Sequence, residues 1–405
     1  MILPLAILAA LAAIVYISPT ILVYTCAFLG FMVVFTYFFP FLHILLPVPN
    51  LREKYGAEWA LVTGGSTGIG KAIVEKLATQ GLNVVIVGLP DDAKNKFLSK
   101  TTEEMKKKYP ERKFESVGVK FAPGIDYMNP IIKATEDKKV QVVFNNAGYI
   151  VAEFFNQVPI SAQVANVECN AVAPVKITHH FLSKMIDSNT RGCIVFTSSA
   201  AAYMPAAFSS MYGATKAFMS AFGAALQMEN ASRGVDVCVV HPSPVASRFY
   251  EGIKPLEALK FFNPFQVQPE ELPDEIFRSI GRVGWRDIGG IAIGFRMLFA
   301  FVNMNFAVMF GSVLAPMTMP DFKKSNKTAF TEEVVGEYAP MSMEFLNHSR
   351  GKGHSLRTVC CSAFVMSFTS TTEPCSPMET RILQMQLQIP FLSLVDHGVP
   401  TRCAV

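Results

Sequence analysis

Tyr212 and Lys216, four residues apart, are the residues whose types and spacing point most directly to chemistry. Residues 210–227 favour a helix, so the two side chains are expected on the same helix face. A free phenol has a pKa of about 10 and works as an acid or base near neutral pH only when a nearby cation favours the phenolate. We expect Lys216 to lower the pKa of Tyr212, which would give a proton to a carbonyl oxygen or take one from an alcohol.

A serine at the right distance separates this pair from a chance match. Ser199 ends an apolar run 13 residues before Tyr212, and its hydroxyl would hydrogen bond the same substrate oxygen and stabilise developing charge. Tyr109 and Lys113 have the same mutual spacing, but Lys96 stands where a serine would be needed. The three residues together, and not the tyrosine–lysine pair, therefore carry the prediction.

A glycine-rich segment, residues 63–70, predicts a dinucleotide cradle. Residues 59–62 have the character of a strand and residues 71–78 that of a helix, and this context gives a glycine match its meaning. Gly64 would permit the tight turn and Gly68 would let backbone approach the pyrophosphate, which the helix N-terminus would face. The cofactor contacts expected here are Gly64, Ser66, Thr67, Gly68, Ile69 and Gly70.

Alternating strands and helices must position these residues. Further apolar strands are expected at 83–87, 117–119, 140–144, 193–197 and 235–240, with helical stretches between them. Alternation of this kind is typical of a parallel sheet with helices on both faces. The predicted fold class is α/β, a Rossmann-type doubly wound parallel sheet, preceded by N-terminal transmembrane helices.

Small polar residues follow the fourth of the expected strands, counted from 59–62. Asn145, Asn146 and Ala147 would fasten neighbouring strands and leave room for the cofactor where a ligand crevice is expected. Asn170, in a helical stretch, is expected to hold a water that links Lys216 to solvent; an ordinary surface or capping asparagine is the alternative.

The loop after the second strand, residues 88–94, has neither an acid for a ribose hydroxyl nor an arginine for a 2′-phosphate in the usual place. The residues therefore leave the choice between NAD and NADP open.

The motifs at 63–70, 145–148, Ser199 and 212–216, in this order, resemble the classical short-chain dehydrogenase/reductase family over about residues 50 to 250. The resemblance implies a catalytic tetrad and a set of cofactor contacts. The tetrad would be Asn170, Ser199, Tyr212 and Lys216. Tyr212 and Lys216 would also contact the cofactor, as would Pro242 and Val245 beside the nicotinamide.

The apolar leader and the residues that follow it, 50–56, are similar to a membrane-bound group within that family, the 17-beta-hydroxysteroid dehydrogenases and very-long-chain 3-oxoacyl-CoA reductases. This resemblance implies the endoplasmic reticulum membrane and favours NADP(H) over NAD(H). Leu89 and Lys120 depart from that group's pattern, which tends to place an arginine and an acidic residue at these positions.

The N-terminus predicts membrane attachment. The first 51 residues contain no Asp, Glu, Lys or Arg, and both 1–17 and 21–47 are long enough to approach or exceed the length of a spanning helix. A cleaved signal peptide is the alternative, but there is no basic region before the apolar run. Arg52 and Lys54 follow directly and favour a cytosolic catalytic domain by the positive-inside tendency.

Composition and patterning suggest four regions in the 405 residues. They are a membrane anchor of one or two helices (1–48), the catalytic domain (50–290), an apolar membrane-associated segment (291–318) and a polar, poorly ordered tail (320–405). A net charge of only +4 gives no argument for nucleic acid, and the eight cysteines show no metal-ligand spacing, so no metal site is predicted. A homodimer stays open.

Three functions are compatible with these observations. The leading one is a membrane-anchored reductase of a lipid ketone, with 3-oxoacyl-CoA as substrate in very-long-chain fatty acid elongation. The second keeps the same site but acts on a steroid or retinoid. The third is a catalytically silent membrane scaffold, whose usual mark would be loss of the tyrosine, and Tyr212 is present.

Overall fold

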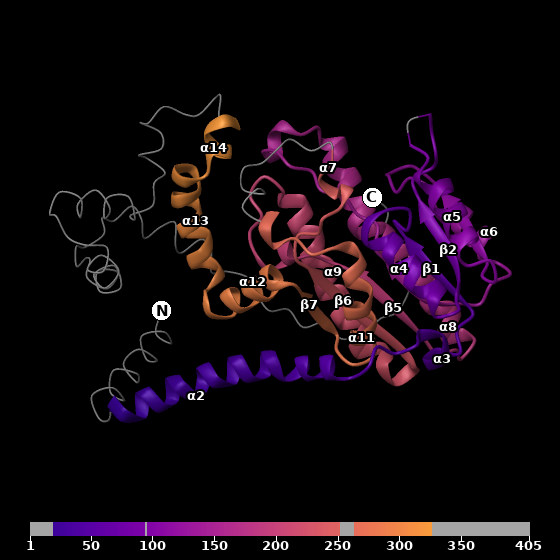
Figure 1. Cartoon of the computed structure of the whole chain (residues 1–405). Coiled ribbons are helices and arrows are strands. Elements are labelled where there is room, and N and C mark those ends of the chain that lie inside the picture. The colour runs from indigo at the N-terminus through magenta and orange to yellow at the C-terminus, as the bar shows by residue number, and fades with distance from the viewer. Residues whose placement is uncertain (1–18, 94, 252–262, 326–405) are drawn as a thin grey trace, which may run out of the picture. The chain divides into compact units, whose positions relative to one another are not determined.

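One parallel sheet organises the computed structural model, which describes residues 19–93, 95–251 and 263–325. The sheet has seven strands in the order β3-β2-β1-β4-β5-β6-β7 (Figure 1). The strands are β1 (Trp59–Thr63), β2 (Asn83–Gly88), β3 (Phe114–Gly118), β4 (Val140–Asn145), β5 (Gly192–Thr197), β6 (Val235–Pro242) and β7 (Trp285–Ile288). The predicted Rossmann-type doubly wound fold is confirmed.

Burial explains which strands could be predicted. All residues of β1, β2 and β4 are buried, as is usual for parallel strands covered on both faces, so these strands are predominantly apolar in the sequence. At the edge of the sheet, β3 buries only Phe114 and Val117, so its first residues form no apolar run that the sequence could show. The strand starts at Phe114, three residues before the expected position. The strand β7 was not predicted, because Arg286 and Asp287 occupy its centre although both are buried.

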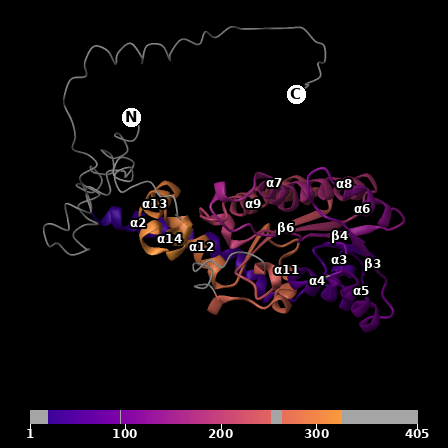
Figure 2. The same cartoon turned by 90° about the horizontal axis from the view of Figure 1, so that it is seen from above.

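Helices cover both faces of the sheet (Figure 2). One face carries α3 (Leu51–Tyr55), α4 (Gly68–Thr79), α5 (Phe97–Lys108) and α11 (Leu272–Ser279). The other carries α6 (Met128–Ala134), α7 (Ile160–Val167), α8 (Ala173–Asp187) and α9 (Ser210–Asn230). Each layer encloses its own apolar cluster against the strands. Because the strand order reverses between β1 and β4, a crevice is expected at the carboxyl ends of these two strands.

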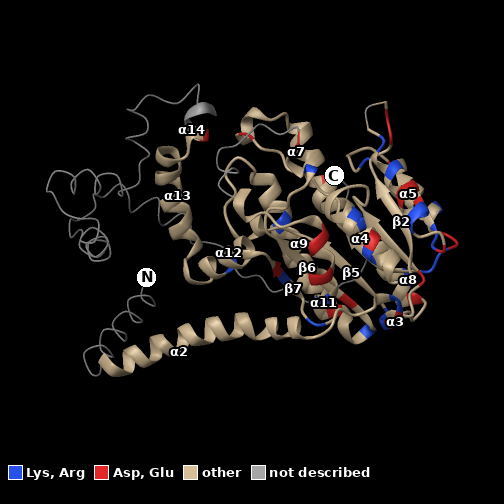
Figure 3. Cartoon of the chain, in the orientation of Figure 1, with Lys and Arg blue, Asp and Glu red and all other residues tan. Residues whose placement is uncertain are grey.

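The N-terminal apolar region is a helix that could cross a membrane by its length and composition. It runs through α2 (Pro19–Phe38) and the 3₁₀ helix η1 (Phe39–Leu45), and it carries no acidic residue, lysine or arginine (Figure 3). Its connection to the domain includes a hydrogen bond from Tyr37 to Asp287 of β7, at 2.9 Å. The other expected span, residues 1–17, lies outside the described residues.

A second apolar element follows the sheet. Helices α12 (Gly290–Phe301) and α13 (Met304–Thr318) meet at a bend of 111° and together have the length and composition of one broken span or a re-entrant loop. They coincide with the expected apolar segment, 291–318. The short helix α14 (Pro320–Ser325) comes next, and the rest of the expected tail, residues 326–405, lies outside the described part of the chain.

Candidate active site

The glycine-rich turn between β1 and α4 leaves no room for side chains where it meets β4. Gly64 has a φ of +63°, and a Cβ there would lie 3.0 Å from the Ala147 Cα atom. A Cβ on Gly70 would lie 2.0 Å from the Gly64 carbonyl oxygen. Helix α4 begins at Gly68, and Gly68 and Ile69 line a large cavity, so unpaired N–H groups of the helix start are available to an anion there.

Polar side chains fasten the three central strands at their carboxyl ends. The Thr63 hydroxyl accepts hydrogen bonds from the Asn146 and Ala147 backbone N–H groups, both at 3.0 Å. The Asn146 side chain donates to the Thr63 carbonyl oxygen at 3.2 Å and accepts from the Thr197 hydroxyl at 3.1 Å. Strands β1, β4 and β5 are therefore held in fixed register at the cavity.

Most of the residues predicted to contact the cofactor line this cavity. They are Gly64, Ser66, Thr67, Gly68, Ile69, Asn146, Ala147, Tyr212, Lys216, Pro242 and Val245. Gly70 and Asn145 do not. Gly70 is needed for close packing, whereas the Asn145 amide is buried and donates to the Thr178 hydroxyl of α8 at 3.0 Å. From the sequence, Asn145 is expected with Asn146 and Ala147 among the cofactor contacts. Successive side chains of a strand point to opposite faces, and that of Asn145 points to α8.

The cavity wall after β2 presents no carboxylate from the adjoining loop. Gly88, Leu89 and Lys120 line the cavity there. Asp91 instead accepts hydrogen bonds from backbone N–H groups at the start of α5, at 3.1 Å and 3.0 Å. Asp92 accepts from the Asn95 N–H group at 2.7 Å. Both acids are thus engaged in shaping the loop.

Tyr212 and Lys216 project from α9 into the same cavity, as their spacing predicted. The Lys216 ammonium lies 5.5 Å from the centre of the Tyr212 ring and donates to the Thr197 carbonyl oxygen at 2.8 Å. Both side chains are buried. Ser199, which follows β5, lines the cavity beside them, and its hydroxyl accepts from the Ala201 N–H group at 3.2 Å.

Burial dominates the acidity of Tyr212. It raises the pKa of the phenol well above its ordinary value, while a hydrogen bond with the Ser199 side chain lowers it. The expected depression by the neighbouring ammonium is therefore not the main effect at this site. Ser199 and Tyr212 both line the cavity, so a substrate oxygen bound there can meet both hydroxyls.

Burial also lowers the pKa of the Lys216 ammonium, to about 8, because the charged form loses its hydration. Near neutral pH the site accordingly holds a protonated phenol and an ammonium that is close to its titration range. In this form the phenol can give up a proton, and the cation can then stabilise the phenolate that remains.

Asn170 lies in a π-helical turn, η3 (Glu168–Val172), between α7 and α8. Its side chain is buried and clamps the Tyr149 peptide: its Oδ1 atom accepts from the Tyr149 N–H group at 3.1 Å, and its Nδ2 atom donates to the Tyr149 carbonyl oxygen at 3.0 Å. A Cβ on Gly148 would lie 3.1 Å from Asn170 Oδ1 and 3.2 Å from Lys216 Nζ, so the asparagine is next to the lysine. That Asn170 holds a water remains a prediction.

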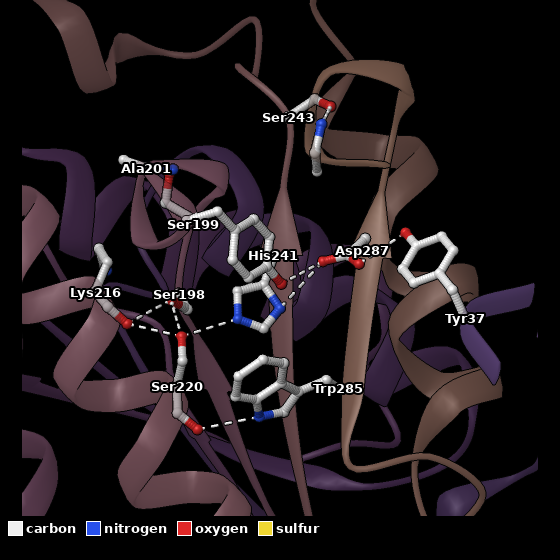
Figure 4. Close-up of polar contacts among 12 residues, drawn as sticks. Tyr37, Ser198, Ser199, Ala201, Lys216, Ser220, His241, Ser243, Trp285 and Asp287 are labelled. Atoms are coloured by element: carbon white, nitrogen blue, oxygen red, sulfur yellow. Dashed lines mark hydrogen bonds and ion pairs between the residues drawn. The ribbon is translucent and has the colours of Figure 1, made fainter. Parts of the chain in front are cut away.

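A buried polar chain runs behind the site (Figure 4). The Ser198 and Ser220 hydroxyls both donate to the Lys216 carbonyl oxygen at 2.8 Å. The Ser220 hydroxyl also meets His241 Nε2 at 2.8 Å, and His241 Nδ1 lies 3.4 Å from Asp287. Burial lowers the pKa of His241 to about 3, so the imidazole is neutral. The chain therefore fixes the backbone of α9 at the lysine.

Sequence reasoning missed this chain and one wall of the cavity. Asp287 lies on the unpredicted strand β7, and Ser220 and His241 carry no spacing signal. The cavity, of about 1640 Å³, exceeds a usual ligand pocket of roughly 300–1,000 Å³ and has room for more than a dinucleotide. Beyond the tyrosine its wall is apolar and includes Phe295 of α12 and Gly311 of α13.

Known proteins share the sequence and the fold. Residues 58–257 match the family described as short chain dehydrogenase. An inactive hydroxysteroid dehydrogenase-like protein 1 of Mus musculus is 31% identical over 201 residues, 49% of this chain and 59% of that protein. A very-long-chain 3-oxoacyl-CoA reductase of the same species is 31% identical over 202 residues, 49% of this chain and 62% of that protein. The match thus spans about three fifths of these curated relatives.

A solved structure from a study of 7beta-hydroxysteroid dehydrogenase stereoselectivity superposes with a TM-score of 0.56 and 25% identity, covering 65% of this chain and 100% of that one. The motif order, the strand order and these similarities agree. The chain belongs to the short-chain dehydrogenase family.

Proposed function

We propose that this chain is a membrane-anchored oxidoreductase that reduces a lipid ketone with a nicotinamide cofactor, and that the ketone is a 3-oxoacyl-CoA of very-long-chain fatty acid elongation. The observation that carries the proposal is one cavity with two kinds of wall. Tyr212, Ser199 and Lys216 stand between a glycine cradle and an apolar surface. A reductase of lipids needs this combination.

The residues present fit a dinucleotide. Gly64 and Gly70 form a cradle that a Cβ would fill, and the start of α4 offers N–H groups to phosphate. Tyr212 and Lys216 line the same cavity, where they would hold the ribose. When bound, the cofactor supplies a hydride to the carbonyl carbon.

The chain's own residues supply the proton and stabilise the charge. The Tyr212 hydroxyl donates its proton to the carbonyl oxygen, which becomes the alcohol oxygen of the product. The Ser199 hydroxyl donates a hydrogen bond to that oxygen, and the Lys216 ammonium stabilises the phenolate left on Tyr212. Asn170 keeps the Tyr149 peptide in place beside the lysine.

NADP(H) is the cofactor we propose. The cavity wall after β2 has Lys120 and no acid from the loop, since Asp91 and Asp92 bond backbone N–H groups. A cation there favours a 2′-phosphate, whereas a ribose hydroxyl is usually bound by an acid.

We expect Lys120→Glu to raise the KM for NADPH at least tenfold and to leave the KM for NADH within about twofold, as steady-state kinetics would measure. Equal effects on both cofactors would contradict this assignment.

Two other functions have specific support. A structure from work on a hydroxysteroid dehydrogenase resembles this chain, which favours a steroid or retinoid substrate. An inactive relative is as similar as the reductase is, at 31% identity each, which favours a silent scaffold. Tyr212 and Lys216 argue against the scaffold, because both line the cavity together with Ser199.

The apolar helix 19–45, with Arg52 and Lys54 just after it, supports a membrane location. We propose the endoplasmic reticulum membrane, with the catalytic domain in the cytosol. The segment of α12 and α13 is proposed to associate with the same membrane.

Cofactor consumption by the purified full chain in detergent tests the proposal. NADPH and NADH are each offered with a 3-oxoacyl-CoA, a steroid ketone or a retinal. We expect oxidation of NADPH that depends on the 3-oxoacyl-CoA. Faster turnover of the steroid or retinoid would support the second function, and dinucleotide binding without turnover of any ketone would support the scaffold.

A further inference from the structure

Helix α13 is apolar on two neighbouring faces that meet different surroundings. Its inner face consists of small residues four apart, Ala307, Gly311 and Ala315, and all three line the cavity. Its outer face carries large apolar side chains that are 42–55% exposed, namely Phe306, Phe310, Leu314 and Met317. A helix that is apolar all round is normally buried or in contact with lipid.

The inner face continues into the reactive part of the cavity. Phe295 and Phe299, four residues apart on α12, line the same cavity as Tyr212. Phe322 of α14 also lines the cavity, and the centre of its ring lies 4.7 Å from that of Phe208. One apolar wall therefore runs from the catalytic tyrosine along both helices.

Charge indicates what the outer face meets. Residues 290–318 contain a single charged side chain, Arg296. Its guanidinium lies over the Trp285 ring at 4.3 Å and the Tyr203 ring at 5.0 Å, so this charge is held against the domain. The polar side chains of α13 are Asn305 near its start and two residues that line the cavity, Ser312 and Thr318, whose hydroxyls donate to carbonyl oxygens of the helix itself, at 2.7 Å and 2.8 Å.

We propose that the inner face of α13 is the binding groove for the acyl chain of the substrate, and that its outer face lies in the hydrocarbon of the bilayer. The lipid chain would thus pass from the membrane to Tyr212 along a predominantly apolar wall. The small residues at 307, 311 and 315 leave the space, and the aromatic residues of α12 guide the chain to the site. This inference rests on the proposed function and adds the residues that select a long apolar chain.

Gly311 offers a direct test. A Cβ added at Gly311 has no atom within 4 Å, so Gly311→Leu fills the cavity without a clash. Gly294 of α12 provides the matched control position. A Cβ there also meets nothing within 4 Å, but Gly294 does not line the cavity. Each methylene taken from water is worth about fourfold in affinity, so loss of about two methylene positions predicts a roughly tenfold effect.

The measurement is kcat/KM of the full chain for long and short 3-oxoacyl-CoA substrates. In Gly311→Leu the long-to-short ratio is expected to fall at least tenfold from that of the wild type, and in Gly294→Leu to stay within about twofold. An unchanged ratio in Gly311→Leu would overturn the groove while leaving the proposed reductase intact.

A binding readout separates failure of the groove from failure of the proposed function. A photoreactive long-chain fatty acid in phosphatidylcholine vesicles is expected to label the inner-face residues Ala307 and Ala315 in the wild type and not in Gly311→Leu, whereas the outer-face residues Phe310 and Leu314 are labelled in both by contact with the bilayer. If the wild type reduces no 3-oxoacyl-CoA, the reductase proposal fails and the inner-face labelling still decides: its loss in Gly311→Leu supports the groove, and inner-face labelling that is absent or unchanged overturns it.

Fluorescence tests the membrane contact of the outer face. Emission from Phe310→Trp is expected to be quenched by brominated acyl chains in vesicles. Phe155→Trp serves as the control, because Phe155 is 52% exposed, close to the 47% of Phe310, but lies in η2 (Phe155–Gln157) on the catalytic domain. Equal quenching of the two variants, or none in Phe310→Trp, would overturn the bilayer contact.

Discussion

Lys216 is a cation that the fold buries almost completely. It is 4% exposed and has the Thr197 carbonyl oxygen as its hydrogen-bond partner. Burial lowers its pKa to about 8, and burial raises the pKa of Tyr212. Near pH 7 the phenol therefore keeps its proton and most of the lysine is charged. This is the protonation state that reduction of a ketone requires.

The rate of reduction should consequently depend on pH through Lys216. We expect kcat/KM, which reports groups of the free enzyme, to be level from pH 6 to pH 7 and to fall as the pH rises through about 8. The reason is that a neutral amine cannot stabilise the phenolate formed on Tyr212. In Lys216→Arg the fall should disappear, because a guanidinium stays charged. A profile that is level up to pH 9 in the wild type would contradict this account.

At the scale of elements, Asp287 joins three parts of the fold. Its carboxylate on β7 accepts hydrogen bonds from Tyr203 of η4 (Ala200–Tyr203) and from Tyr37 of α2, and it faces His241 of β6. Burial raises the pKa of Asp287, while the two tyrosine hydrogen bonds lower it. The N-terminal apolar helix thus reaches the same polar chain that fixes the backbone of Lys216.

Removal of the Tyr37 hydroxyl should weaken this junction. Tyr37→Phe deprives a buried carboxylate of one donor, and we expect the free energy of unfolding to fall by about 1–3 kcal/mol. Chemical denaturation in detergent would measure it. Tyr24→Phe is the control, since Tyr24 lies on the same helix and is 71% exposed. Equal effects of the two substitutions would show that the hydrogen bond to Asp287 contributes nothing.

Local sequence patterns allowed part of the fold and of the candidate site to be predicted, but not the contacts between residues far apart in the chain. The Tyr212 and Lys216 pair could be recognised because both residues lie on one helix, and β1 and β2 because buried parallel strands are predominantly apolar. The partners of Asp287 come from positions up to 250 residues away, and no local spacing encodes such contacts. Likewise, the cavity wall at Gly311 depends on how α13 lies against the domain, which periodicity does not specify.

For the whole molecule, the orientation in the membrane decides which compartment supplies cofactor and substrate. The sequence contains Asn-x-Ser/Thr glycosylation sequons at Asn230, Asn326 and Asn347. The sequon at Asn230 cannot report the orientation, because Asn230 is fully buried and donates to the Leu226 carbonyl oxygen. The sequons at Asn326 and Asn347 lie outside the described residues. An orientation test therefore needs an acceptor site on the exposed surface of the catalytic domain.

The loop after α5 provides one. Glu111→Asn with Lys113→Thr creates a sequon at two exposed positions. Arg52 and Lys54 favour the proposed cytosolic orientation by the positive-inside tendency, so we expect no glycan on this variant in cells, and we expect protease to cleave the domain in intact microsomes. A glycan removable by an endoglycosidase would show that the domain faces the lumen.

The central claim is that Tyr212 delivers the proton in a dinucleotide-dependent reduction. Its most direct test compares Tyr212→Phe with Tyr109→Phe, since Tyr109 precedes a lysine at the same spacing but bonds Glu75, at 3.4 Å, and does not line the cavity. We expect Tyr212→Phe to lower turnover of 3-oxoacyl-CoA at least about a hundredfold with the affinity for NADPH within about twofold of wild type, and Tyr109→Phe to match wild type in both. Turnover by Tyr212→Phe close to that of the wild type would contradict the account.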